Sequence, residues 1–308
     1  MKKLKRIFYK KNILISGGTG SIGSEIVRYI IKNYLPKQVR IYSRDESKHF
    51  FLQKEIEEIG TKIDVKFLIG DIRDKERLDK AFRDVDIVFH AAALKHVPYC
   101  EYNPFETIKT NIYGTQNVID LSIEHNVEKV VAISTDKAVN PNTIMGISKL
   151  MMERMIVSSS YYIGKSRTKF CVVRFGNVLN SRGSVVPLWI EQIEKGKSVT
   201  VTNKNMKRFF MTIPEAVELI ILAASKMKGQ EVFVLKMPEK NIYDFAKETI
   251  KKYGKGKKVK IKITGARERE KIVEYLYTDE EKKLMVEKKN FFVIFPNSKI
   301  LRERKNNY

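Results

Sequence analysis

The chain has 308 residues, and 43% of them are hydrophobic, so it can bury a core as one large domain or as two modest ones. Lysine and arginine number 59 against 36 aspartates and glutamates, which gives a formal net charge of +23. Such a charge indicates either an anionic partner or a surface that is lysine-rich throughout. The basic residues are scattered and interleaved with glutamate, which favours a lysine-rich surface, and we expect no nucleic-acid partner.

Two cysteines and four histidines show no metal-ligand spacing, so the sequence predicts no metal site and no disulfide. No apolar run reaches the roughly 18 residues that a membrane-spanning helix needs. The basic start, residues 1–12, lacks the apolar stretch of a signal peptide and could make only a weak peripheral contact with an anionic membrane. We therefore expect a cytoplasmic protein.

Strand and helix patterns alternate through the first half of the chain. The expected strands cover residues 12–16, 39–42, 65–69, 86–93, 129–134 and 170–175. Helices are expected from about residue 21, over 75–82, along an apolar stripe at 105–123, and over about 146–162. This alternation predicts an α/β fold with a doubly wound parallel sheet.

The pattern changes after about residue 177. Shorter expected strands, at 199–202, 232–235 and 259–263, alternate with helices, which predicts a smaller C-terminal α/β domain. We expect a first domain over residues 1–178 and a second over 179–308. The two are expected to interleave in part, because a helix near 214–227 has an apolar face that suits packing on the first domain.

A glycine-rich turn joins the first strand to the first helix. Its sequence is Ser-Gly-Gly-Thr-Gly-Ser-Ile-Gly over residues 16–23. Glycines at this spacing permit a tight turn, close approach to a pyrophosphate, and close packing of helix on strand. The pattern predicts a Rossmann-type NAD(P) site in the first domain. The residues that we assign to it are Gly17, Thr19, Gly20, Ser21, Ile22 and Gly23.

The end of the second strand indicates which dinucleotide binds. Ser43 and Arg44 suit the 2′-phosphate of NADP, whereas Asp45 keeps NAD possible. We favour NADP. After the third strand, Asp71 and Ile72 are placed to reach the adenine, with a helix cap for residues 75–82 as the alternative role of Asp71.

The fifth strand ends in Ser-Thr-Asp-Lys, residues 134–137, and Met145 and Lys149 follow at helical spacing. A hydroxyl at a strand end followed by Tyr-x-x-x-Lys is the catalytic pattern of short-chain dehydrogenases, but methionine stands here in place of tyrosine. A thioether cannot take a proton at neutral pH. Met145 therefore marks an inactive enzyme or a core residue, or else an enzyme in which Asp136 and Lys137 supply acid and base, as an elimination requires. A solvated Asp–Lys pair is the alternative interpretation.

Several blocks resemble the UDP-N-acetylglucosamine 4,6-dehydratases, which belong to the extended short-chain dehydrogenases and to the polysaccharide-biosynthesis group. The blocks are residues 17–23, 91–98, 101–104, 109–111, 134–139, 174–177, 181–187 and 208–212. The resemblance runs from about residue 11 to 295. It implies a homo-oligomer acting on a UDP-sugar.

The resemblance also implies a redox-neutral dehydration. Bound NADP takes a hydride from C4 of the sugar, Lys137 removes the C5 proton, Asp136 protonates the departing 6-hydroxyl, and the hydride returns to C6. Thr135 would hold the C4 oxygen, and Lys149 the nicotinamide ribose. Further cofactor residues implied are Ala91, Ala92, Ala93, Lys95 and Asn111. The substrate residues implied are Lys95, Asn177, Arg182, Val186, Arg208, Arg267 and Glu270.

Two departures from the family pattern bear on this expectation. Methionine at 145 occurs in the membrane-anchored members and in a soluble branch that also epimerises C5, so the configuration of C5 in the product stays open. The family's Arg-x-Gly-Glu-Lys block lacks its glycine in residues 267–271. The alternative functions are a nucleotide-sugar 4-epimerase or reductase, and a non-catalytic dinucleotide-binding protein.

Overall fold

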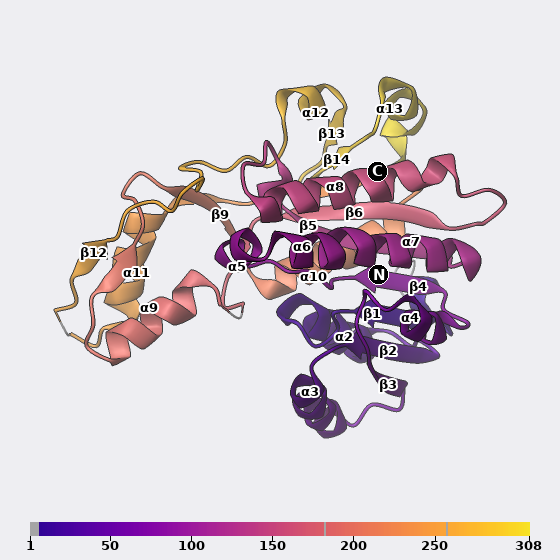
Figure 1. Cartoon of the computed structure of the whole chain (residues 1–308), viewed down its shortest axis with the longest axis horizontal. Helices are drawn as coiled ribbons and strands as arrows, with labels where there is room; N and C mark the ends of the chain where they lie inside the picture. The colour runs from indigo at the N-terminus through magenta and orange to yellow at the C-terminus, as the bar shows by residue number, and fades with distance from the viewer. Residues whose placement is uncertain (1–5, 182, 257) are drawn as a thin grey trace.

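A nine-stranded sheet forms the centre of the computed structural model, which describes residues 6–181, 183–256 and 258–308 (Figure 1). Its strands run in the order β13-β14-β10-β6-β5-β4-β1-β2-β3. They are β1 (Asn12–Ser16), β2 (Gln38–Ser43), β3 (Asp64–Ile69), β4 (Ile87–His90), β5 (Lys129–Thr135), β6 (Lys169–Phe175), β10 (Val232–Leu235), β13 (Met285–Glu287) and β14 (Phe291–Ile294). The strands from β3 to β10 are parallel, and β14 and β13 add an antiparallel edge. The predicted doubly wound parallel fold is confirmed.

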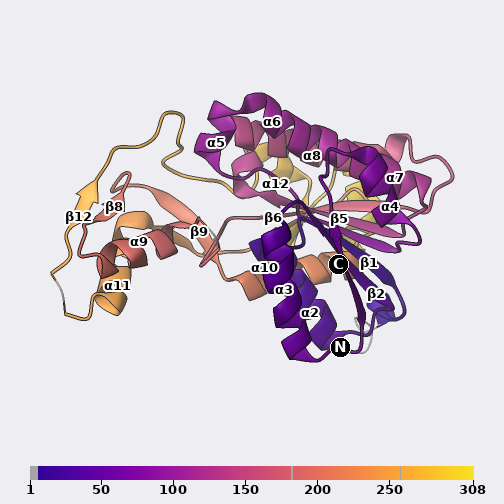
Figure 2. The ribbon, with the colours of Figure 1, turned by 60° about the horizontal axis from the view of Figure 1, so that its bottom comes forward.

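Helices cover both faces of this sheet, as Figure 2 shows. One layer holds α4 to α8, and the other holds α2, α3 and α10, with α10 packed on α2 and on the central strands β5 and β6. The helices are α2 (Ser21–Asn33), α3 (Glu46–Ile59), α4 (Lys75–Phe82), α5 (Val97–Tyr102), α6 (Pro104–Ile108), α7 (Gly114–Glu124), α8 (Ile144–Ser158), α9 (Val185–Glu194), α10 (Ile213–Lys226), α11 (Ile242–Tyr253), α12 (Asp279–Lys283) and α13 (Ser298–Arg304). Short helical turns are η1 (Lys109–Tyr113), η2 (Asp136–Ala138), η3 (Ser159–Tyr161) and η4 (Lys305–Asn307).

Burial explains why the sequence pattern predicted the strands and helices of the N-terminal half of the chain. Ile13, Leu14 and Ile15 of β1 are completely buried, because helices cover both faces of a parallel sheet. On α2, Ile26, Val27 and Ile30 are also completely buried and form its inner face. Continuous apolar strands and a periodic helix face are the patterns on which the prediction rested.

Two expected elements differ from the structure. The strand expected over 86–93 ends at His90, and residues 91–93 leave the sheet as a loop. The helical stripe at 105–123 is interrupted by η1, a π-helical turn between α6 and α7. Within that turn Asn111 is buried and bonds to the loop after β4, so the extra residue of the π turn serves a contact that periodicity does not reveal.

A smaller lobe lies at one end of the molecule, on the left in Figure 1. Its strands are β7 (Asn177–Val178), β8 (Val199–Val201), β9 (Lys207–Met211), β11 (Glu239–Asn241) and β12 (Ile261–Ile263), in a three-stranded sheet β11-β9-β7 and a pair β12-β8. With α9 and α11 they enclose a second apolar core around Trp189, whose Nε1 donates to Thr200 O at 2.7 Å. The strands β10, β13 and β14 follow residue 178 but lie in the main sheet, and the exact boundary between the domains stays a prediction.

The chain returns from the small lobe to the main sheet through residues 264–278, which we call the return strap. Its far end is anchored by Arg174 of β6, which is 1% exposed. The Arg174 guanidinium donates to Leu276 O at 3.0 Å and pairs with Glu153 at 2.6 Å and with Glu281 at 2.8 Å. Removing one member of a buried ion cluster leaves an uncompensated charge and is strongly destabilising, so this cluster holds the end of the strap in place.

No helix within the described residues is both long and apolar enough to cross a membrane.

Candidate active site

A cavity of about 1220 Å³ opens at the carboxyl ends of the central strands and extends under the small lobe. The glycine turn after β1 lines one end, and residues of β7, β9, α9 and the return strap line the other. In sheets of this type the ligand site lies at the strand ends where the connections change direction. Here that point lies between β1 and β4.

The glycine turn has the shape of a pyrophosphate cradle. Gly17 has a φ of +68°, and a Cβ added there would lie 2.7 Å from the amide nitrogen of Ala92. A Cβ on Gly23 would lie 2.3 Å from the carbonyl oxygen of Gly17. The helix α2 begins at this turn without a side-chain cap, so its positive end faces the cavity. The residues present fit a dinucleotide.

The polar groups after β2 divide into two sets. The hydroxyl of Ser43 bonds to Thr19 Oγ1 at 2.7 Å and to His49 Nε2 at 3.1 Å, which braces the turn. Asp45 caps α3, because its carboxylate accepts from the amide of Lys48 at 3.0 Å and also pairs with the Lys48 ammonium. Arg44 lies at the cavity wall, as does Lys48, which sequence reasoning missed.

Several predicted cofactor residues lie just behind the cavity wall. Asn111 accepts from the amide of Leu94 at 2.8 Å and donates to Ser148 Oγ at 2.9 Å, so it ties the loop after β4 to α8. The cap of α4 is Asp74, so the alternative role of Asp71 as that cap is wrong. The predicted cofactor residues absent from the lining are Thr19, Ser43, Asp45, Asp71, Ile72, Ala92 and Asn111. The predicted cofactor residues on the wall are Gly17, Gly20, Ser21, Ile22, Gly23, Arg44, Ala91, Ala93, Lys95 and Lys149.

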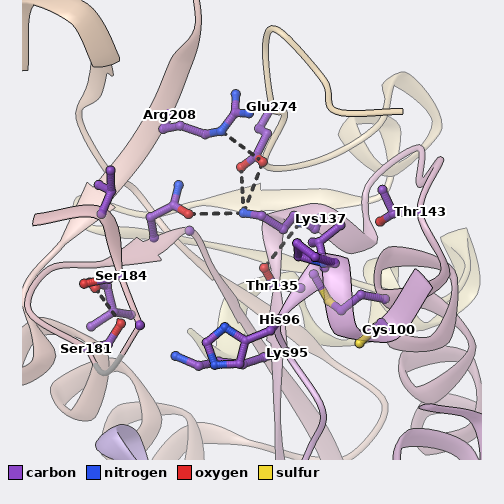
Figure 3. A pocket seen from close by; sticks show the side chains of 18 of the residues that line it. Lys95, His96, Cys100, Thr135, Lys137, Thr143, Ser181, Ser184, Arg208 and Glu274 are labelled. Carbon is purple, nitrogen blue, oxygen red and sulfur yellow. Dashed lines mark hydrogen bonds and ion pairs between the residues drawn. The ribbon is translucent and has the colours of Figure 1, made fainter. Parts of the chain in front are cut away.

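The predicted acid–base residues meet where β5 ends and η2 begins (Figure 3). Thr135 and Lys137 line the cavity, whereas Asp136 is completely buried behind them. Thr135 Oγ1 donates to Asp136 Oδ1 at 2.9 Å, and Lys137 Nζ donates to the same oxygen at 3.1 Å. The alternative of a solvated Asp–Lys pair is therefore wrong for Asp136, because water does not reach it.

Burial decides the chemistry of Asp136. It raises the pKa of this carboxyl to about 7, against the attraction of Lys137 and with a further contribution from the nearby Glu274 carboxylate. The second oxygen, Oδ2, is buried without a hydrogen-bond partner. A carboxyl with these properties can gain and release a proton near neutral pH.

Lys137 makes three polar contacts through its Nζ atom. It donates to Asp136 Oδ1 at 3.1 Å, to Asn177 Oδ1 at 3.2 Å and to Glu274 at 3.1 Å. Burial works against its charge, but the two carboxylates outweigh burial and raise the pKa of Lys137. Three acceptors match the three N–H bonds of an ammonium, which is the resting state of this group.

The pKa of Lys149 is shifted downward, in the opposite direction to that of Lys137. It lies on α8 one turn after Met145, and both residues line the cavity. Its Nζ donates to Ile133 O at 2.5 Å and contacts Met152 Sδ at 3.0 Å. Burial lowers the pKa of Lys149 to about 8, with Glu153 opposing. A pKa of about 8 leaves a minor share of Lys149 as the neutral amine at pH 7, and the two donated contacts suit that form, whose lone pair stays available.

The predicted substrate residues are spread along the small lobe. Val186, Arg267 and Glu270 line the cavity together with Asn177 and Arg208. Arg182 lies outside the described residues. The Arg208 guanidinium is largely committed, because it donates to the carbonyl oxygens of residues 207, 271 and 272 and pairs with Glu274 at 3.3 Å and with Glu270 at 3.6 Å. It holds the return strap against β9.

The missing glycine of the 267–271 block has a structural consequence. Arg269, which stands where the family has glycine, has a φ of +61°. This left-handed conformation costs a residue with a Cβ roughly 1–2 kcal/mol. The turn is therefore kept, although the residue that forms it without strain is absent.

Sequence reasoning missed Glu274. It lies on the return strap, is 4% exposed, and contacts both Lys137 and Arg208 (Figure 3). A single glutamate in a charged, irregular segment carries no periodic signal, so only the folded chain reveals that it belongs to the site. Among the described residues, no cluster of three or more His, Cys, Asp or Glu side chains is placed to hold a metal ion.

Comparison with known proteins adds a family to this geometry. Residues 13–296 match the model of the family described as "Polysaccharide biosynthesis protein". An uncharacterized membrane protein of Methanocaldococcus jannaschii is 50% identical, over 94% of this chain and 87% of its own. A UDP-N-acetylglucosamine 4,6-dehydratase (inverting) of Campylobacter jejuni is 42% identical, over 96% of this chain and 86% of its own. A UDP-glucose 4-epimerase of Rickettsia akari is 41% identical, over 89% and 80%.

Two solved structures are similar to this chain in their fold. The X-ray structure of Pen from Bacillus thuringiensis superposes with a TM-score of 0.90 at 44% identity, over 94% of this chain and 90% of that one. DesIV, a dTDP-glucose 4,6-dehydratase from Streptomyces venezuelae solved with NAD and TYD bound, superposes with a TM-score of 0.77 at 18% identity, over 88% and 90%. At 18% identity the second comparison supports the fold alone.

Proposed function

The chain belongs to the polysaccharide biosynthesis protein family, and from this we propose that it is a nicotinamide-dependent UDP-N-acetylglucosamine 4,6-dehydratase. The observation that carries the proposal is the pair Asp136–Lys137 at the cavity end of β5 beside the dinucleotide cradle, in which Asp136 is completely buried and Lys137 lines the cavity. An oxidation alone needs no second acid–base pair, whereas elimination of water needs one group to remove a proton and another to supply one. The 42% identical Campylobacter relative carries the corresponding name.

The cofactor that we propose is NADP. When bound, it would supply the acceptor for the C4 hydride and its donor to C6. Arg44 and Lys48 lie on the cavity wall after β2, where a 2′-phosphate would lie, and each also pairs with a carboxylate: Arg44 with Asp71 at 3.4 Å, and Lys48 with Asp45. Asp45 is engaged with the start of α3, so it is less suited to the ribose hydroxyls that NAD would present.

The residues at the end of β5 divide the elimination between them. Thr135 holds the C4 oxygen from the cavity wall. The proton shared across the 3.1 Å contact between Lys137 and Asp136 moves to Asp136 when substrate excludes water, because a neutral pair is favoured in a medium of low dielectric. Lys137 then takes the C5 proton, and Asp136 supplies a proton to the departing C6 hydroxyl by way of the cavity groups bonded to it.

Lys149 takes over the task of the missing tyrosine. Met145 cannot accept the C4 hydroxyl proton, but Lys149 lies one helical turn away on the same cavity wall with its pKa lowered to about 8 by burial. Its neutral amine receives the C4 proton, directly or across the ribose hydroxyls, and releases it to solvent between turnovers.

The small lobe binds the UDP end of the substrate. Arg267 and Lys95 bring positive charge to the cavity wall, and Asn177 and Val186 lie beside them. Arg208 acts indirectly: it holds in place the return strap, which carries Arg267 and Glu270. Arg182 belongs to the same group by its position in the sequence.

We further propose a cytoplasmic homo-oligomer. Both cysteines, Cys100 and Cys171, are free and buried, as suits a reducing compartment. On α5, α6 and α8, Tyr102, Phe105 and Met151 are exposed by 84%, 71% and 48%. Large apolar side chains exposed on one helical layer favour association. Light scattering of the purified protein tests this; a monomer at micromolar concentration would contradict it.

A UDP-glucose 4-epimerase is the second candidate, because the Rickettsia relative carries that name. Epimerisation at C4 gives no task to the pair of Lys137 on the cavity wall and Asp136 buried behind it, which favours the dehydratase. Incubation with UDP-N-acetylglucosamine without added nicotinamide, followed by mass spectrometry, separates the two. Dehydration lowers the substrate mass by one water, whereas epimerisation leaves it unchanged, and proton NMR of the product gives its C5 configuration.

A further inference from the structure

Glu274 is a buried carboxylate that reaches the acid–base pair from a distant part of the chain. Most residues around it on the return strap are exposed, but Glu274 itself is 4% exposed. One oxygen lies 3.1 Å from Lys137 Nζ and 3.3 Å from Arg208 Nε. Burying a carboxylate costs several kcal/mol unless cations compensate for it, so the two contacts explain why it can lie there.

Charged groups from three segments face this carboxylate. They are Asp136 and Lys137 on η2, Arg208 on β9, and Glu270 and Lys271 on the strap, with the neutral Asn177 of β7 beside Lys137. Burial opposes ionisation of Glu274, but the attraction of Lys137, the contact with Asp136 and the charge of Arg208 hold its pKa at about 2. Glu274 is therefore a permanent anion at working pH and does not itself exchange protons.

Three neighbouring groups hold the amine of Lys137 in place, as is typical of a catalytic base. Asp136 contacts Nζ from η2, directly after β5, Asn177 contacts it from β7, and Glu274 adds a third contact from the strap. Without Glu274 two acceptors would remain, and the long lysine side chain could rotate about their mean direction. A base must be fixed to within a fraction of an ångström to meet a C–H bond efficiently.

We propose that Glu274 is the positioning residue of Lys137: it fixes the direction of Nζ and stabilises the ammonium that forms when Lys137 takes the C5 proton. This inference rests on the dehydratase function proposed above. In that step the C5–H bond breaks and its proton joins the Nζ lone pair. The C5–H electrons form the C5–C6 double bond, and the hydroxyl leaves C6 as water with the proton from Asp136. Glu274 contributes charge and direction to the transition state, in the way that the acid of a catalytic triad serves its histidine.

The test compares Glu274→Gln with Glu280→Gln, a change of the same chemistry at an exposed position of α12. The measurement is exchange of the C5 hydrogen of the keto product in deuterated buffer, followed by NMR across a range of pH. We expect about a 10²–10³-fold slower exchange for Glu274→Gln, and the wild-type rate for Glu280→Gln. The lower inflection of the pH profile should also move to lower pH in Glu274→Gln, because the anion that holds protons on Lys137 and Asp136 is gone.

The outcomes separate this inference from the function on which it rests. If wild-type protein removes no water from UDP-N-acetylglucosamine, the proposed function fails. If wild type dehydrates and Glu274→Gln exchanges C5 at a similar rate, or slows with an unmoved pH inflection, the positioning role fails alone. If Glu274→Gln does not fold, Glu274→Asp provides the test, because it keeps the negative charge but places it one methylene further from Lys137. We then expect slower C5 exchange with the lower inflection of the pH profile unmoved. Exchange at the wild-type rate would overturn the proposal.

Discussion

Replacing Gly17 by alanine tests the cofactor turn, and Gly60 offers a control with nearly the same backbone. Gly17 has a φ of +68° and Gly60 a φ of +67°, so alanine meets a similar backbone strain of roughly 1–2 kcal/mol at both positions. The surroundings differ, because a Cβ at Gly60 meets nothing within 4 Å, whereas at Gly17 it would lie 2.7 Å from Ala92 N. Relief of that overlap requires the backbone after β4 to move, which adds about 1–3 kcal/mol.

We therefore expect Gly60→Ala to lower the free energy of unfolding by about 1–2 kcal/mol and Gly17→Ala by about 2–5 kcal/mol. Urea denaturation of cofactor-free protein gives both values, because bound cofactor would add its own stabilisation. Titration with NADP should show affinity near wild type for Gly60→Ala and a loss of tenfold or more for Gly17→Ala. Equal stability of the two variants, with equal cofactor affinity, would refute the close approach that we assign to Gly17.

Three further predictions concern single side chains. Arg44→Ala should weaken NADP binding about tenfold and leave NAD binding unchanged, because only NADP has a 2′-phosphate for this cation; equal loss for both, by titration calorimetry, would contradict that role. Lys149→Met should abolish dehydration yet raise the free energy of unfolding at pH 7 by about 2 kcal/mol, since burial lowers the pKa of Lys149 from 10.5 to about 8. The unfolded chain binds more protons between those values, so wild-type stability should rise from pH 8 to 10.5, and a flat profile would argue against it. Arg269→Gly should raise the free energy of unfolding by up to about 1 kcal/mol and leave turnover unchanged. A lower free energy of unfolding would show that the Arg269 side chain contributes more than its left-handed backbone costs.

The sequence sufficed for the parts of the fold that rest on local patterns. Strand β1 and helix α4 have the predicted bounds, because buried runs and helix caps are written in consecutive residues. The turn at Gly17 was also predictable, since its glycines stand between a strand and a helix. The interruption of the 105–123 helix by η1 was not, because it serves a contact between Asn111 and a loop 17 residues earlier.

The candidate site, too, was predicted from the sequence only where it depends on neighbouring residues. Asp136 and Lys137 are neighbours in sequence, so their partnership could be inferred, but their burial could not. The contact of Lys137 with Glu274 spans 137 residues and depends on how the return strap packs. The commitment of the Arg208 guanidinium to strap carbonyls is likewise a tertiary result, and it moves Arg208 from a direct to an indirect role.

In the proposed function, the pair Asp136–Lys137 removes water from a UDP-sugar while the cofactor is recycled. The most direct measurement incubates purified protein with UDP-N-acetylglucosamine in deuterated buffer, without added nicotinamide, beside the variant Lys137→Ala. We predict a wild-type product that has lost one water and carries one deuterium at C5, and no product from Lys137→Ala, which should still bind NADP. A substrate of unchanged mass with folded, cofactor-loaded wild type, or full activity of Lys137→Ala, would contradict the account.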